Sequence, residues 1–228
     1  MSPQADRNSA EPANPAVVEQ LARLVAAHNE AWPNTTDPFD PDWRSPCETG
    51  EPRLAASGEL EIPWQPFART DTARHTLFAP LERALEITVH QDITTYFGSY
   101  YSGGIETDSP EGSVSLLQLW NANDATRLIE NLLGHALAKQ RAKAPYSVFF
   151  ACTEVDSELF LAIENHTGHI LLERPGYKPE RTVAGSLAEF LSTLTPAPPE
   201  RHPERAAFLA ARAPGPGGDN NDDGPNRR

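Results

Sequence analysis

Hydrophobic residues recur at helical spacing in five stretches of the chain. The first stretch, within residues 17–32, places six side chains on one face of an amphipathic helix: Val17, Val18, Leu21, Leu24, Val25 and His28. A second long stripe follows Asn123 or Asp124 as its N-cap and consists of Leu128, Ile129, Leu132, Leu133, Ala136 and Leu137. Shorter helices are predicted in residues 76–87, in residues 91–100 before the Gly103–Gly104 pair, and in residues 185–194 after Ser186.

Short apolar runs without helical spacing predict strands between these helices. Such runs occupy residues 113–120, 146–153 and 158–165, and residues 166–169 turn the third run into a hairpin with residues 170–176. A further strand is expected within residues 58–67, where prolines indicate an edge or an end. Hairpin-linked strands with helices before and between them predict an α+β fold with a mainly antiparallel sheet.

Both ends of the chain differ in composition from its middle. Residues 1–15 and 195–228 are polar and hold ten of the 22 prolines, so we expect both segments to be disordered. Residues 16–194 then form a single domain.

The middle of the chain carries nearly all of the negative charge. Residues 16–194 hold 25 acidic residues against 13 lysines and arginines. No Lys or Arg occurs in residues 84–126 or 144–173, although both spans contain several acids. A domain with this balance repels nucleic acid and anionic lipid and attracts basic partners, although each acid taken alone is also explained by solubility.

Candidate catalytic and metal-binding residues are few. His135 lies inside the long predicted helix with no nucleophile motif near it, so a structural histidine is the favoured interpretation. His166 and His169 bracket a turn without a second pair of ligands, and Cys47 and Cys152 lack the paired spacing of a zinc site. The sequence predicts no catalytic residue, no metal and no cofactor. The absence of a signal sequence or a long apolar run predicts a cytoplasmic protein.

Several motifs in order give the chain a resemblance to a known family. The most specific are WQPF at residues 64–67, ENLLGH at residues 130–135 and KQR at residues 139–141. With the segments around them, from residue 19 to residue 194, they resemble the Syd family of bacterial SecY-interacting proteins, which belongs to the wider SUKH superfamily of α+β domains.

The resemblance implies a binding function. Syd-like proteins are non-enzymatic, use a concave acidic surface to bind the basic cytosolic loops of SecY, and regulate or check the translocon. They lie peripherally on the cytoplasmic side of the inner membrane and reach it through SecY. The alternative from the wider superfamily is an immunity protein that neutralises a basic toxin.

The predicted partner-binding residues come from the base-free spans. They are Glu86, Glu106, Asp108, Glu111, Glu154, Asp156 and Glu158. Four residues within the matching motifs have two open interpretations, groove or core: Trp64, Tyr96, Trp120 and Glu130.

Overall fold

The structure is a computed structural model that describes residues 13–154 and 157–199. Most of the two predicted terminal segments, residues 1–12 and 200–228, lie outside the described residues, as does Asp156.

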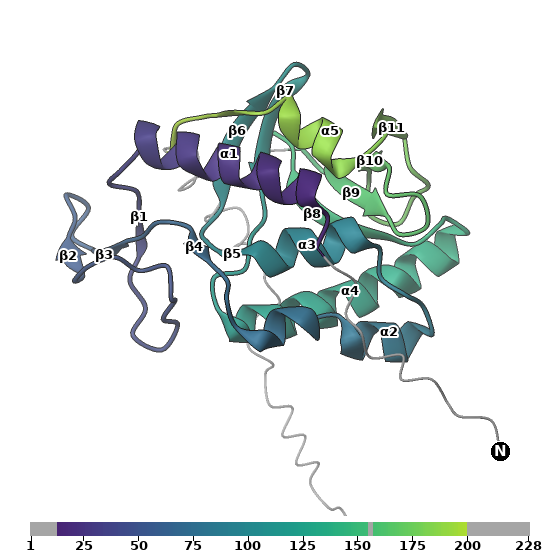
Figure 1. Cartoon of the computed structure of the whole chain (residues 1–228), viewed down its shortest axis with the longest axis horizontal. Helices are drawn as coiled ribbons and strands as arrows, with labels where there is room; N and C mark the ends of the chain where they lie inside the picture. The colour runs from purple at the N-terminus through teal and green to yellow at the C-terminus, as the bar shows by residue number, and fades with distance from the viewer. Residues whose placement is uncertain (1–12, 155–156, 200–228) are drawn as a thin grey trace, which may run out of the picture.

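The predicted helices are confirmed. The described residues form α1 (Pro15–Ala31), α2 (Ala79–Leu85), α3 (Gln91–Ser99), α4 (Ala122–Ala142) and α5 (Leu187–Ser192), with a short 3-10 helix, η1 (Thr72–His75), before α2. Figure 1 shows α1 and α5 lying across one side of the molecule with α3 beside α1. The two long apolar stripes account for α1 and α4, because each stripe offers one continuous face for burial.

A seven-stranded sheet with antiparallel pairs forms the centre of the α+β fold (Figure 1). Its strands, in spatial order, are β11 (Arg181–Ala184), β10 (Ile170–Glu173), β9 (Phe160–Glu164), β8 (Ser147–Cys152), β7 (Gly112–Leu116), β6 (Ile105–Ser109) and β12 (Thr195–Pro196). The mainly antiparallel sheet predicted from the hairpin pattern is thereby confirmed. Strands β6, β11 and β12 were not predicted, and β12 lies just beyond residue 194, where the domain was expected to end.

Two small sheets flank the central one. The first joins β1 (Thr36–Pro38), β3 (Leu60–Pro63) and β2 (Arg53–Leu54), and the second pairs β4 (Phe67–Ala68) with β5 (Tyr100–Tyr101). The three-stranded sheet lies at one side of the molecule, away from β9 to β11 (Figure 1).

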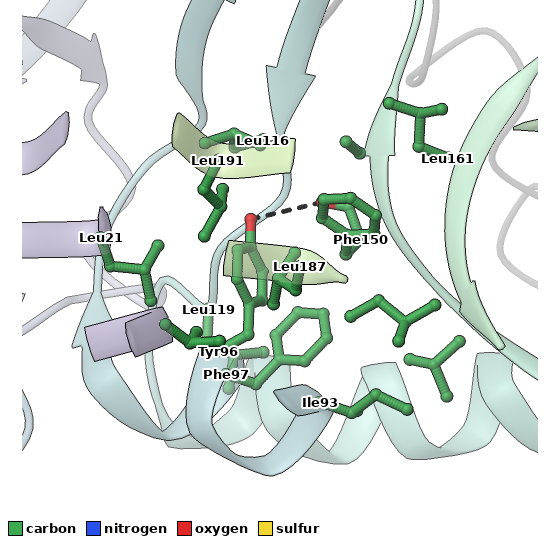
Figure 2. Packing of buried hydrophobic residues seen from close by; sticks show 14 of the residues in the cluster. Leu21, Ile93, Tyr96, Phe97, Leu116, Leu119, Phe150, Leu161, Leu187 and Leu191 are labelled. Carbon is green, nitrogen blue, oxygen red and sulfur yellow. Dashed lines mark hydrogen bonds between the residues drawn. The ribbon is translucent and has the colours of Figure 1, made fainter. Parts of the chain in front are cut away.

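The core is built from all five helices and the central sheet, and Figure 2 shows its centre. A bulge in β8 lets Phe150 and Ala151 both face this core. The Tyr96 ring meets the rings of Phe97 and Phe150 edge-on, and its hydroxyl donates to the Phe150 carbonyl oxygen at 3.4 Å.

Several local predictions were wrong. Val18 and Leu137 are 39% and 54% exposed, so each lies outside the buried stripe of its helix. The N-cap of α4 is Asn121, whose side chain accepts from the Asp124 amide at 2.9 Å.

The glycine pair does not end α3, because the helix stops at Ser99 and the chain enters β5. Gly103 instead allows a close approach, since a Cβ there would lie 2.6 Å from the Trp64 ring.

Candidate functional site

The hairpin of β6 and β7 holds two of the predicted acidic residues on one face. Glu106 pairs with Ser115 and Asp108 pairs with Ser113, so both carboxylates project to the same side of the sheet. Glu106 is only 3% exposed and accepts a hydrogen bond from the Ser115 hydroxyl at 2.6 Å. Its side chain is therefore part of the folded interior, whereas Asp108 is half-buried.

The tip of this hairpin presents Glu111 to solvent. Its side chain is 54% exposed and forms an ion pair with Arg181 on β11. Strand β11 is at one end of the seven-stranded sheet, and the hairpin is near the other end. The ion pair therefore shows that the sheet curls far enough to bring its two ends together.

The segment after β8 adds further acids beside the hairpin. Glu154 is exposed, and its carboxylate accepts from the Ser113 amide at 3.1 Å. Glu158 is also exposed on this segment. We call the three exposed acids Glu111, Glu154 and Glu158 the hairpin acids. With Glu86, they are the members of the predicted site that are exposed within residues 13–154 and 157–199.

Glu86 is not part of this group. It is exposed at the C-terminal end of α2, in a left-handed conformation with φ 55°. Figure 1 places α2 at the opposite end of the molecule from the tip of β6 and β7. The structure thus separates one predicted acid from the others.

A buried polar cluster contains His135. Its Nε2 lies 3.3 Å from the Ser147 hydroxyl, and that hydroxyl donates to Glu173 Oε2 at 3.1 Å. Lys139 completes the cluster, with its Nζ 2.7 Å from Glu173 Oε1. Lys139 lies in the last turn of α4, is only 3% exposed and is neutralised by Glu173.

The arrangement of this cluster is structural rather than catalytic. In a nucleophilic triad the acid orients the histidine, which in turn activates the hydroxyl. Here Glu173 accepts directly from Ser147, and its carboxylate is 3.9 Å from the same His135 nitrogen that faces the hydroxyl. Ser147 has no exposed surface. The favoured interpretation of His135 as a packing residue agrees with this geometry.

His135 is predicted to make the stability of the fold depend on pH. Burial, followed by the positive charge of Lys139, lowers the pKa of His135 from 6.5 to about 4. The unfolded chain therefore binds a proton here that the folded chain excludes, so stabilisation is full above pH 6.5 and is lost as the pH falls toward 4.

We expect the native chain to lose about 2 kcal/mol of unfolding free energy through this group between about pH 7.5 and about pH 5. Urea titrations at both values should show this loss, and His135→Gln should show a correspondingly smaller one. Equal losses in the two proteins would contradict the assignment to His135. His28 on α1 also has its pKa lowered by burial. It is present in both proteins, so its contribution to the pH dependence cancels in the comparison.

The two turn histidines lie on an exposed hairpin turn. His166 and His169 are both exposed around the hairpin turn between β9 and β10. Gly168 within that turn, at φ 74°, packs on the ring of His90. Across residues 13–154 and 157–199, no three His, Cys, Asp or Glu side chains gather as metal ligands.

The aromatic residues of the matching motifs belong mainly to packing. Trp64 and Tyr96 are at most 1% exposed. Trp120 is half-buried, meets the Trp64 ring edge-on and donates its indole N–H to the Trp43 carbonyl at 2.8 Å. Glu130 is exposed on α4. Of the two open interpretations, core is therefore confirmed for Trp64 and Tyr96.

Comparison with known proteins identifies the family. A family model described as Syd protein (SUKH-2) matches residues 16–196. The chain belongs to the Syd family. A protein named Protein Syd from Pseudoalteromonas atlantica is 34% identical over 177 residues, which cover 78% of this chain and 90% of the relative. Protein Syd from Hahella chejuensis is 42% identical over 133 residues, covering 58% of this chain and 67% of the relative.

The family match extends the resemblance to the last strand. It ends at residue 196, the final residue of β12, and so covers every helix and strand of the described residues apart from Pro15, the first residue of α1. Within that described part of the chain, no helix combines the length and the apolar character needed to cross a membrane.

Proposed function

We propose that this Syd-family chain is a non-enzymatic protein that binds the basic cytosolic loops of SecY and regulates or checks the assembly of the translocon. The observation that carries the proposal is the exposure of Glu111 at the tip of the β6–β7 hairpin and of Glu154, which is hydrogen-bonded to the same hairpin at Ser113, with Glu158 exposed four residues further along the chain. Glu106 and Asp108 add negative charge behind them on the same hairpin.

The chemistry of the partner fits this surface. Cytosolic loops of membrane proteins are enriched in Lys and Arg. An acidic surface steers toward such loops and away from anionic lipid, and it favours a fast, salt-sensitive encounter. The protein would then lie in the cytoplasm, peripheral to the inner membrane, with SecY as its link to the membrane.

Charge reversal of the hairpin acids tests the proposal. The triple variant Glu111→Lys, Glu154→Lys and Glu158→Lys should bind SecY in lipid nanodiscs at least about tenfold more weakly than the native chain. Binding of the native chain should weaken as salt rises and should be absent from empty nanodiscs. Affinities would be measured by surface-immobilised nanodiscs at low and moderately high salt.

A matched triple variant distinguishes the effect of the hairpin acids on SecY affinity from the effect of a changed net charge. Glu51→Lys, Glu59→Lys and Glu86→Lys reverse three exposed acids that lie away from the hairpin. We expect this control to retain most of the affinity, and circular dichroism should show both variants folded. Equal weakening in the two triples would show that net charge matters and that the hairpin acids are not the site.

The alternative immunity function predicts a different outcome. If the folded native chain did not bind SecY at low salt but bound a basic toxin through the same acids, the SecY proposal would be wrong. The hairpin acids would still be the binding site.

A further inference from the structure

A groove of about 950 Å³ lies between η1, α2 and α3, away from the acidic hairpin. Ala13, just before α1, and Val18 of α1 also line it. Seven of the lining residues carry hydroxyl groups: Thr72, Thr76, Thr88, Thr94, Thr95, Ser99 and Tyr100. The hydroxyls of Thr76, Thr94 and Ser99 already donate to backbone carbonyl oxygens. Such a lining is polar enough to receive a hydrated ligand.

Positive side chains also converge on this groove, in a chain whose net charge is −13. Arg69 and Arg74 line it, as does His75, whose Nε2 accepts a hydrogen bond from Arg74. Arg69 is only 3% exposed and is fixed by hydrogen bonds to Asp71 and to the Phe97 carbonyl oxygen. Its guanidinium also lies over the Tyr101 ring, 4.3 Å from the ring centre, so this cation is held in place before any ligand arrives.

Arg74 has donor capacity left. Its Nε donates to His75 Nε2 at 3.1 Å and its Nη1 donates to the Arg69 carbonyl oxygen at 2.8 Å. Within the described part of the chain, its Nη2 has no acceptor. A guanidinium held at two nitrogens with a third still available is preorganised to bind an anion.

The carboxylates near the groove already have donors. Glu82 accepts from the Val89 amide at 2.9 Å. Asp71 accepts from Arg69 and from the Arg74 amide, and the hydrogen bond from Arg69 holds the pKa of Asp71 below its ordinary value. These contacts reduce the repulsion that an incoming anion would meet.

We propose that this groove binds a phosphate group, with Arg74 as its principal donor and Arg69 as a fixed positive charge behind it. Phosphate fits because it is a compact anion with several oxygens, which the free donor of the Arg74 guanidinium can reach. The same chemistry occurs in free phosphate and in the headgroup of an anionic lipid. The proposal is independent of SecY binding, because none of the hairpin acids lines the groove.

Inorganic phosphate is the first probe. The full chain would be titrated with sodium phosphate against sodium chloride of equal ionic strength, and the amide NMR signals of Arg74, Thr94 and Gly98 would be followed. We expect a saturable shift of these signals with phosphate and none with chloride.

Two variants test the assignment. Thr72→Glu places a carboxylate in the groove, and the exposed Thr72 side chain makes no hydrogen bond within the described residues that would be lost. Arg74→Gln removes the donor itself. Each should weaken phosphate binding by about tenfold, the loss expected for one charge-assisted hydrogen bond. Arg83→Gln, on the exposed face of α2 outside the groove, is the matched control and should bind as the native chain does.

Vesicles then distinguish the source of the phosphate. Binding to vesicles of phosphatidylcholine with phosphatidic acid, absent from phosphatidylcholine alone and lost in Thr72→Glu, would support a lipid headgroup. Binding of free phosphate without vesicle binding would support a soluble ligand. No saturable phosphate shift, or an unchanged shift in a folded Thr72→Glu protein, would overturn the proposal.

Discussion

Replacing Glu173 with leucine is expected to lower the free energy of unfolding by about 3–5 kcal/mol. The Glu173 carboxylate has no exposed surface and is the ion-pair partner of Lys139, which is itself only 3% exposed. Without the carboxylate, the ammonium group is left in the interior without a counter-charge, and the Ser147 hydroxyl loses its acceptor. Urea denaturation followed by circular dichroism measures the loss.

Two further variants give this measurement its controls. Glu180→Gln removes a carboxylate from an exposed pair with Arg174 and should cost no more than about 1 kcal/mol. The double variant Lys139→Met with Glu173→Leu should recover much of the lost stability, because a buried pair can be replaced by apolar residues of similar size. Similar costs for Glu173→Leu and Glu180→Gln would contradict the view that the buried charges depend on each other.

Replacing Phe150 with alanine is expected to lower the free energy of unfolding by about 3–5 kcal/mol, the usual cost of removing a buried aromatic side chain. Phe150 is fully buried, and its ring lies 5.5 Å from the Tyr96 ring and 5.8 Å from the Phe190 ring, both edge-on (Figure 2). Its loss would open a cavity where β8, α3 and α5 meet. The same denaturation experiment measures the change.

Phe67→Ala is the matched control, because Phe67 is 49% exposed on β4. We expect it to cost no more than about 1 kcal/mol. If the two phenylalanine variants unfolded at the same urea concentration, the aromatic cluster around Tyr96 would not be the centre of the core.

Elements with a repeating apolar pattern were predictable from the sequence. Helices α1 and α4 carry long stripes, and β8 and β9 are apolar enough to stand out from their surroundings. Strand β6 has the sequence IETDS, and its acids made it resemble part of an acidic loop. It is a strand because β7 and β12 pair with its two edges. The hydrophobic pattern of the segment itself does not reveal such pairing.

The candidate site was predictable in kind but not in geometry. The base-free spans pointed to the acids around the hairpin, yet spacing alone did not show that Glu106 turns inward to Ser115. The ion pair between Glu111 and Arg181 joins residues 70 positions apart. Arg181 lies on β11, a short exposed edge strand without an apolar pattern, so its role depends on how the sheet curls.

The last strand determines where the chain can be shortened. Thr195 and Pro196 cover the outer edge of β6, and Ala197 follows as a buried residue whose amide donates to the Glu106 carbonyl oxygen at 2.8 Å. A chain cut after residue 194 would leave the backbone groups of an acid-bearing strand open to pairing with a second molecule. Shortened versions prepared for crystallisation or binding work should therefore extend beyond Ala197, so that self-association through this edge is not mistaken for recognition of a partner.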